Sequence, residues 1–359
     1  MMDNRQKIER LLREIAIPNC DKRLGDFNFL LKSVDKGTDE SNFLITLPFP
    51  INTSQKIQLV QNIKDGLSGK YSQLKFDVDF VIKAKKVQSN VARVPNIKNI
   101  IAVASGKGGV GKSTVSANLA IELNRMGAKV GLLDADLYGP SQTLMMGVRD
   151  QKPEKDKDHF IPVNNHFGIE IMSMGFLIDD DQAVVWRGPM ISKALQQLLF
   201  FTKWGSLDYL IIDLPPGTGD TQLTLSKKIP VTASVVVTTP QEIALIDAGK
   251  AISMFDKVSI PVLGIIENMS YYICSNCYAK EEIFGSGGGE KLAQKTNVAL
   301  LGQLPLACEI REAMDTGSID KMGRYSELYQ NIAWQLVLAI VKMSDDYSHH
   351  FSNISIETR

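Results

Sequence analysis

The chain has 359 residues and a mass of 39.7 kDa, which is enough for about two domains with ample hydrophobic cores. Its 40 Lys and Arg residues balance 40 Asp and Glu residues, and this zero net charge argues against nucleic acid or an anionic membrane as the main partner. Four cysteines are too few for a disulfide scaffold. The N-terminus has no apolar run after its charged residues, so we expect a cytoplasmic protein.

Residues 1–84 have the pattern of a small α/β domain. Helical spacing or apolar alternation predicts a helix, two strands, a helix and a strand in the order αββαβ. These segments are Ile8–Ile15, Phe27–Leu31, Phe43–Leu47, Ile57–Leu67 and Leu74–Ile82. Residues 85–96 are polar and contain a proline near their end, which predicts a linker.

Residues 97–345 predict a larger α/β domain, because short β-branched runs alternate with helical stretches as in a mostly parallel sheet covered by helices. The predicted strands are Ile100–Ala104, Lys129–Leu133, Ile169–Ser173, Tyr209–Ile212, Ser234–Thr238, Val262–Glu267 and Ala299–Leu304. The mixed charge run Asp150–His159 predicts a solvated loop. The apolar segment Ile332–Met343 is too short and too polar to span a bilayer, and it predicts an amphipathic or buried helix. Residues 346–359 predict a polar tail.

A glycine-rich loop follows the first of these strands. Residues 106–113 read Gly-Lys-Gly-Gly-Val-Gly-Lys-Ser and fit the phosphate-binding pattern G-x-x-x-x-G-K-[ST]. Glycines let backbone N–H groups approach phosphate oxygens, and the next helix adds unpaired N–H groups and the positive end of its dipole. Lys112 supplies charge for the β- and γ-phosphates, and the Ser113 hydroxyl can hold Mg²⁺. The predicted nucleotide-binding residues here are Gly106, Lys107, Gly108, Gly109, Val110, Gly111, Lys112, Ser113 and Thr114.

Acidic residues follow two of the predicted strands. Asp134 and Asp136 come after Lys129–Leu133, and Asp213 comes after Tyr209–Ile212. Phosphoryl transfer needs groups that position metal and water, and the carboxyl ends of parallel strands meet at one edge of a sheet. We therefore expect the three carboxylates beside the phosphate loop.

The segment Cys274-Ser-Asn-Cys277 is a C-x-x-C pair with four competing interpretations. A structural zinc site needs four ligands, usually from two such pairs. A thioredoxin-like redox pair usually begins a helix in a different fold pattern. Two unrelated buried cysteines are the third possibility. The fourth is a half-site completed by a second subunit, because two copies at a two-fold axis supply four thiolates for a [4Fe–4S] cluster or a zinc ion.

Several motifs resemble one ATPase family. The phosphate loop resembles the deviant Walker A motif K-G-G-x-G-K-[ST] of dimeric ATPases. The cysteine pair and four further strings resemble the Mrp/ApbC branch, the iron–sulfur cluster carriers of bacteria. Those strings are Asp134-Ala-Asp-Leu-Tyr-Gly-Pro-Ser, Arg187-Gly-Pro-Met190, Glu267-Asn-Met-Ser270 and Ile283-Phe-Gly-Ser-Gly-Gly-Gly-Glu290. The resemblance runs from Ile97 to Thr316.

The resemblance implies a slow ATPase that works as a homodimer, with ATP and Mg²⁺ sandwiched between the subunits. It implies that Lys107 reaches the partner's nucleotide and that Lys112 contacts the phosphates. Asp136 would position or activate the attacking water, and Asp134 and Asp213 would lie in the Mg²⁺ shell.

The same resemblance implies that Cys274 and Cys277 of two chains hold a [4Fe–4S] cluster, with zinc in aerobic preparations. The cluster would pass to apo iron–sulfur proteins, with other cluster-assembly factors as further partners. In related ATPases an asparagine at the position of Asn268 contacts adenine, although a turn residue is an alternative from sequence alone.

The chain also departs from the family pattern. The N-terminal domain of the relatives often has a cysteine where this chain reads Pro48-Phe-Pro-Ile51, and Ala307 stands where the family often has an aspartate. We expect Cys20 to be a packed thiol and Cys308 to be structural.

Two other functions stay open. A positioning or partition ATPase needs a basic DNA-binding face or a terminal amphipathic membrane helix, and the segment Leu328–Met343 has one basic residue, Lys342. A zinc-bridged, nucleotide-regulated scaffold would differ from the carrier in its metal and its turnover.

Overall fold

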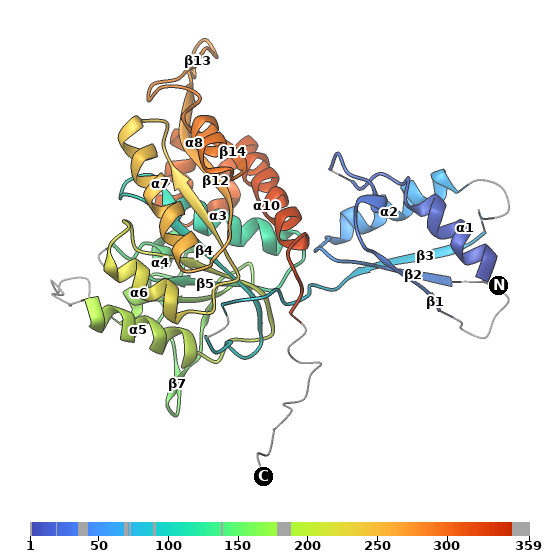
Figure 1. The fold of residues 1–359 in the computed structure, drawn as a ribbon, viewed down its shortest axis with the longest axis horizontal. Helices are drawn as coiled ribbons and strands as arrows, with labels where there is room; N and C mark the ends of the chain where they lie inside the picture. The colour runs from blue at the N-terminus through green and yellow to red at the C-terminus, as the bar shows by residue number, and fades with distance from the viewer. Residues whose placement is uncertain are drawn as a thin grey trace. The chain divides into compact units, whose positions relative to one another are not determined.

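The computed structural model describes residues 2–346 except 19, 35–41, 68–70, 72, 89–90, 138 and 178–187. Arg187 and Tyr138 of the family motifs, and most of the predicted tail, therefore lie outside the described residues. The chain divides into two compact units (Figure 1). The first comprises Met1–Lys83 with Arg125–Ala128, and the second holds the rest of the described chain.

The first unit has the predicted αββαβ order. It contains α1 (Met2–Leu12), β1 (Leu30–Val34), β2 (Asn42–Leu47), α2 (Thr53–Gly66) and β3 (Lys75–Phe80). β2 is central, antiparallel to β1 and parallel to β3, and its buried side chains alternate.

The first predicted strand of this unit was placed too early. β1 begins at Leu30, which pairs with Thr46, although Phe27 and Phe29 are buried as expected. β2 ends at Leu47, and Pro48 follows with no N–H to donate to a ladder. The alternation at Phe27 and Phe29 therefore reflects burial without a strand partner.

The second unit is built on a nine-stranded sheet in the order β13-β12-β11-β4-β10-β5-β9-β8, with β14 also paired to β12. All seven predicted strands are present and parallel to their neighbours in that set. They are β4 (Ile97–Ser105), β5 (Val130–Asp134), β9 (Glu170–Ser173), β10 (Leu207–Asp213), β11 (Ala233–Thr238), β12 (Val262–Ile273) and β14 (Leu300–Leu306). Short antiparallel strands β8 (Val163–Asn164) and β13 (Lys280–Glu281) pair with β9 and β12.

Helices cover both faces of this sheet (Figure 1). α5 and α7 pack on one face, where their apolar residues form a core cluster with Ile100, Leu210 and Ile265. α10 contacts β12 and β14, and the buried Tyr329 and Leu336 confirm that the apolar C-terminal segment is a buried helix. The helices are α3 (Lys112–Arg125), α4 (Gln142–Met145), α5 (Gly188–Phe200), α6 (Asp220–Lys228), α7 (Glu242–Lys257), α8 (Gly288–Thr296), α9 (Cys308–Asp315) and α10 (Ser326–Val341).

The charge run Asp150–His159 is not simply a loop. β6 (Lys155–Asp156) and β7 (His159–Phe160) form an antiparallel hairpin with a two-residue turn. Lys157 has φ of 57°, as such tight hairpin turns require, so this feature depends on a backbone conformation that the charge pattern did not reveal. β6 is exposed to solvent, as expected.

The predicted linker begins inside the second unit. Lys85 is buried, and its ammonium lies 2.6 Å from Asp345 Oδ1 and donates to the carbonyls of Val341 and Met343. The Asp346 N–H donates to the Ala84 carbonyl at 2.9 Å. These contacts fix the segment entering the sheet to the end of α10. No helix in the described residues is long and apolar enough to cross a membrane.

Candidate nucleotide and metal site

The glycine-rich loop lies between β4 and α3, so the helix N-terminus faces the loop as the motif requires. Gly109 and Gly111 have φ of 79° and 82°, a backbone region that favours glycine. A Cβ on Gly106 would meet the Asp247 backbone of α7 at 2.2 Å, and one on Gly111 would meet Asn268 Nδ2 at 2.1 Å. The loop conformation therefore depends on glycine at these positions.

Lys112 and Asp213 form a buried ion pair at the base of the loop. Lys112 Nζ lies 2.6 Å from Asp213 Oδ1, and the two side chains are 6% and 0% exposed. The same carboxylate oxygen accepts from Ser116 Oγ at 2.8 Å, and Oδ2 accepts from Gln142 Nε2 at 3.0 Å. Ser113 is close by, because its hydroxyl oxygen lies 3.4 Å from Lys112 Nζ. The ion pair holds the ends of β10 and α3 together.

Asp134 is fully buried beside Asp213, its partner in the register of β5 and β10. Its carboxylate accepts from the N–H groups of Asp136 and Gln142, both at 3.1 Å, and from Ser173 Oγ at 3.0 Å. Burial, and then the nearby charge of Asp213, raise the pKa of Asp134 to about 7. A carboxyl group in this setting gains from a neighbouring cation.

The arrangement fits Mg²⁺, which prefers oxygen ligands. Two carboxylates and the Ser113 hydroxyl come from adjoining elements, and Asp136, 9% exposed, follows directly after Asp134. Within the described residues, Gln142 Oε1 is a buried acceptor that has no hydrogen-bond partner, although Gln142 Nε2 donates to both Ser113 and Asp213. An unsatisfied acceptor beside two carboxylates is suited to a cation or its bound water.

Asn268 contacts the phosphate loop from β12. Its Nδ2 donates to the Val110 carbonyl at 2.9 Å, and the side chain is buried. β12 is longer than predicted because it continues past Met269. The φ of Met269 is 55°, which interrupts the regular strand, and the pairing of β12 with β14 resumes at Tyr271. One strand therefore runs from the phosphate loop to Cys274, the residue after its end.

The cysteine pair lies in the turn between β12 and β13, at the top of the second unit in Figure 1. The Cys274 N–H donates to Ala279 O at 3.0 Å, and the Tyr278 N–H donates to Cys274 O at 2.9 Å. Cys274 is partly exposed and Cys277 is exposed. Hydrogen bonds from the backbone N–H groups of Cys277 and Asn276 to the sulfur lower the pKa of the Cys274 thiol, which favours the metal-binding thiolate.

The cysteine pair offers two thiols to a metal ion. Across the described part of the chain, no group of three or more His, Cys, Asp or Glu side chains is placed to hold a metal ion. Cys308 is the first residue of α9 and is exposed, and Cys20 is partly exposed, not packed as the sequence suggested. Two further thiolates must come from outside this chain if the site takes four.

The glycine-rich segment after the pair connects the hairpin to α8. Gly285 and Gly287 have φ of 95° and 65°, and the Gly289 N–H donates to the Glu267 carboxylate. Glu267 also accepts from Gln303 Nε2 at 2.9 Å. Glu267 therefore anchors the start of α8 to β12 and β14.

Two of the predicted nucleotide-binding residues make few contacts. The Lys107 side chain is half-buried and has no hydrogen bond or ion pair within the described chain, while the Lys107 carbonyl accepts from Ser105 Oγ at 2.8 Å. The Thr114 carbonyl accepts from Asn118 at 2.8 Å. Sequence reasoning missed three polar groups of the carboxylate cluster, namely Ser116, Gln142 and Ser173.

Comparison with known proteins identifies relatives of most of the second unit. The model of the NUBPL iron-transfer P-loop NTPase family matches residues 96–337. The iron–sulfur cluster carrier protein of Haemophilus influenzae is 51% identical over 319 residues, which are 88% of this chain and 85% of the relative. That of Escherichia coli K12 is 54% identical over 257 residues, 70% of this chain and 69% of the relative. A nucleotide-binding protein from Archaeoglobus fulgidus, solved with ADP, has a TM-score of 0.58 at 38% identity, covering 65% of this chain and 92% of its own.

Proposed function

Because the chain belongs to the NUBPL-type iron-transfer P-loop NTPases, and within them to the Mrp/ApbC-type cluster carriers, we propose that it works as an ATP- and Mg²⁺-dependent homodimer. The dimer holds a bridging [4Fe–4S] cluster between the cysteine pairs of two chains and passes it to apo iron–sulfur proteins. The observation that carries this proposal is a pair of thiols in the turn after a strand that also contacts the phosphate loop.

Each residue of the nucleotide site has a physical role in ATP hydrolysis. The N–H groups of residues 106–113 cradle the phosphates, and Lys112 exchanges part of its contact with Asp213 for a phosphate oxygen. Ser113, Asp134 and Asp213 would hold Mg²⁺, which neutralises charge on the phosphates when bound. Asp136 positions the attacking water, and Lys107, unpaired within the described chain, contacts the partner subunit's nucleotide.

β12 offers a direct connection between hydrolysis and cluster affinity. Asn268 contacts the Val110 carbonyl of the loop, and six residues later the same strand delivers Cys274. A loop that moves when phosphate leaves would shift this strand and with it the spacing between the two cysteine pairs.

Anaerobic reconstitution with iron and sulfide tests the cluster site. We expect about four irons per dimer with broad visible absorbance, since four thiolates suit a [4Fe–4S] cluster. Cys274→Ser should lose the iron, whereas Cys308→Ser and Cys20→Ser, which change thiols outside the hairpin, should retain it. Equal iron in the Cys274→Ser protein would refute the site, and zinc without sulfide in anaerobically purified protein would favour the zinc-bridged scaffold.

A further inference from the structure

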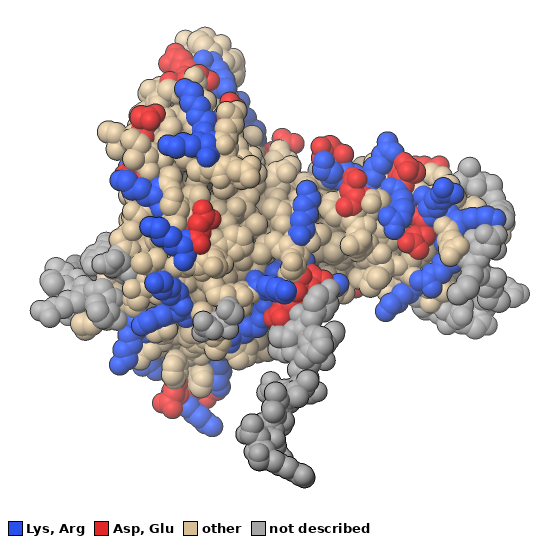
Figure 2. All heavy atoms as spheres, in the orientation of Figure 1, with Lys and Arg blue, Asp and Glu red and all other residues tan. Residues whose placement is uncertain are grey.

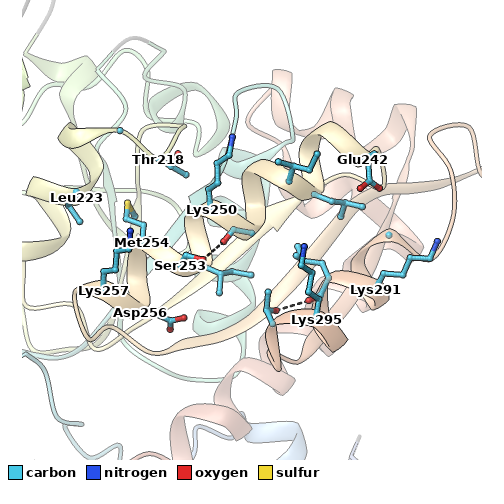
Figure 3. A pocket seen from close by; sticks show the side chains of 18 residues that line it. Thr218, Leu223, Glu242, Lys250, Ser253, Met254, Asp256, Lys257, Lys291 and Lys295 are labelled. Carbon is cyan, nitrogen blue, oxygen red and sulfur yellow. Dashed lines mark hydrogen bonds between the residues drawn. The ribbon is translucent and has the colours of Figure 1, made fainter.

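The second unit has a surface hollow outside the nucleotide and cysteine sites. It is a cleft of about 830 Å³ between α7 and α8 that extends to Thr218 and Gly219 in the loop before α6 (Figure 3). That loop follows Asp213, and α8 follows the segment that leaves the cysteine hairpin. The cleft is therefore close along the chain to both chemical sites, although it shares no lining residue with either.

The cleft has an apolar floor and a basic rim. Leu245, Ile252 and Leu292 lie in the floor and are each less than 9% exposed. Figure 3 shows lysines on both sides, and Figure 2 shows basic side chains gathered over the same helices with fewer acidic ones. The charged lining residues are Lys250, Lys257, Lys291, Lys295, Glu242 and Asp256.

The lining carries a small excess of positive charge. Lys250 Nζ lies 2.9 Å from Asp247 Oδ1, but Lys257, Lys291 and Lys295 make no ion pair with any described residue. Four lysines against two acidic residues leave the lining with two positive charges in excess, and Asp247 beside Lys250 reduces that excess to one. A ligand that fills the cleft needs apolar groups on one side and negative charge at its margins.

We propose that this cleft docks an acidic amphipathic helix of the protein that exchanges a cluster with this chain, an inference that rests on the proposed carrier function. A helix bound in a groove buries its apolar face against the floor and places its flanks at the rim. The apolar face of the partner helix would then contact the apolar floor, and its carboxylates would contact the lysines. Docking here places the partner beside α8, which begins 11 residues after Cys277.

Two other occupants fit less well. A second copy using the same face would bring together two surfaces of the same net positive charge, because a two-fold contact pairs a surface with itself. A flat bilayer does not enter a cleft between two helices, whereas a single inserted helix does, and it would cover Ile246, which lines the cleft and is 53% exposed.

The test uses the full-length protein without iron or nucleotide, so that its outcome is separate from cluster binding. The probe is a fluorescent helical peptide of 16 residues, the length of α7, with Leu on one face and Glu on the other. A peptide with Lys in place of Glu is its control. We expect the acidic peptide to bind and the basic one not to bind. The double variant Lys291→Glu, Lys295→Glu should bind the acidic peptide about tenfold more weakly. Reversal of two exposed lysines elsewhere, Lys152→Glu with Lys321→Glu, should leave the affinity unchanged.

Three results would overturn the proposal. They are no binding of the acidic peptide, an equal loss of affinity in both double variants, or full affinity in the variant Lys291→Glu, Lys295→Glu. Co-sedimentation with anionic phosphatidylserine vesicles that depends on Lys291 and Lys295 would assign the surface to a membrane instead. Cys274→Ser should bind the peptide normally, so a wrong cluster site would leave this result intact.

Discussion

The buried carboxyl group of Asp134 makes a prediction about stability. Its pKa rises from an ordinary value of 3.8 to about 7, chiefly because burial penalises the charged form. The folded state therefore holds the proton more tightly than the unfolded state, and the free energy of unfolding falls as the pH rises from about 4 to about 7. Above that interval the penalty is constant.

The substitution Asp134→Asn removes this titration. Between pH 5 and a pKa of about 7, each pH unit corresponds to about 1.4 kcal/mol. The stability of the variant relative to the natural protein should therefore increase by about 3 kcal/mol between pH 5 and pH 8. An amide has one acceptor oxygen, so one of the three donors to Asp134 also loses its partner, but that cost does not change with pH.

Urea unfolding measures this difference with EDTA present and nucleotide absent. Fluorescence of Trp204 and Trp334 reports on the second unit, which contains both. Asp150→Asn, at an exposed position, is the matched control for the change of one carboxylate to an amide. A constant difference between Asp134→Asn and the natural protein across this pH range would refute the reasoning. Saturating ATP and Mg²⁺ should also remove the pH penalty in the natural protein, because a cation favours the ionised carboxylate.

Three further predictions concern the loop, α9 and the dimer. Gly111→Ala should weaken ATP binding at least tenfold, because its Cβ would collide with Asn268 Nδ2 and its φ is 82°; an unchanged Kd by calorimetry would contradict this. Ala307→Asp should stabilise the protein by about 1 kcal/mol in urea unfolding, because Ala307 is the N-cap of α9 and makes no side-chain cap bond; Ala307→Leu should give no gain. Lys107→Ala should lower ATP turnover at least tenfold while each chain still binds ATP, as measured by phosphate release and nucleotide titration; unchanged turnover would exclude a role in the partner subunit's site.

The loop Gly106–Ser113 could be predicted because its residues are contiguous and its glycines all serve the approach of backbone N–H groups to phosphate. The strand cores could be predicted for a similar reason, since buried parallel strands contain short continuous apolar runs, such as Tyr209–Ile212 within β10. The ends of the strands could not be predicted, because they depend on which residues of the neighbouring strand are available for pairing. β1 begins at the first residue that pairs with β2. β12 continues through Asn268 and Ser270, whose polar side chains do not fit the apolar pattern by which the strand was predicted.

The sequence by itself determined the family and the fold class, and it supplied the residues proposed to bind phosphate and a thiolate-bound metal, because contiguous motifs carry all of these. Only the tertiary structure decided which polar groups serve the carboxylates. Ser116, Gln142 and Ser173 come from three separate elements and meet at Asp213 and Asp134 because parallel strands end at one edge of the sheet. Burial at that edge also sets the pKa of Asp134, a quantity that depends on removal from water and on neighbouring charge and not on the residue alone.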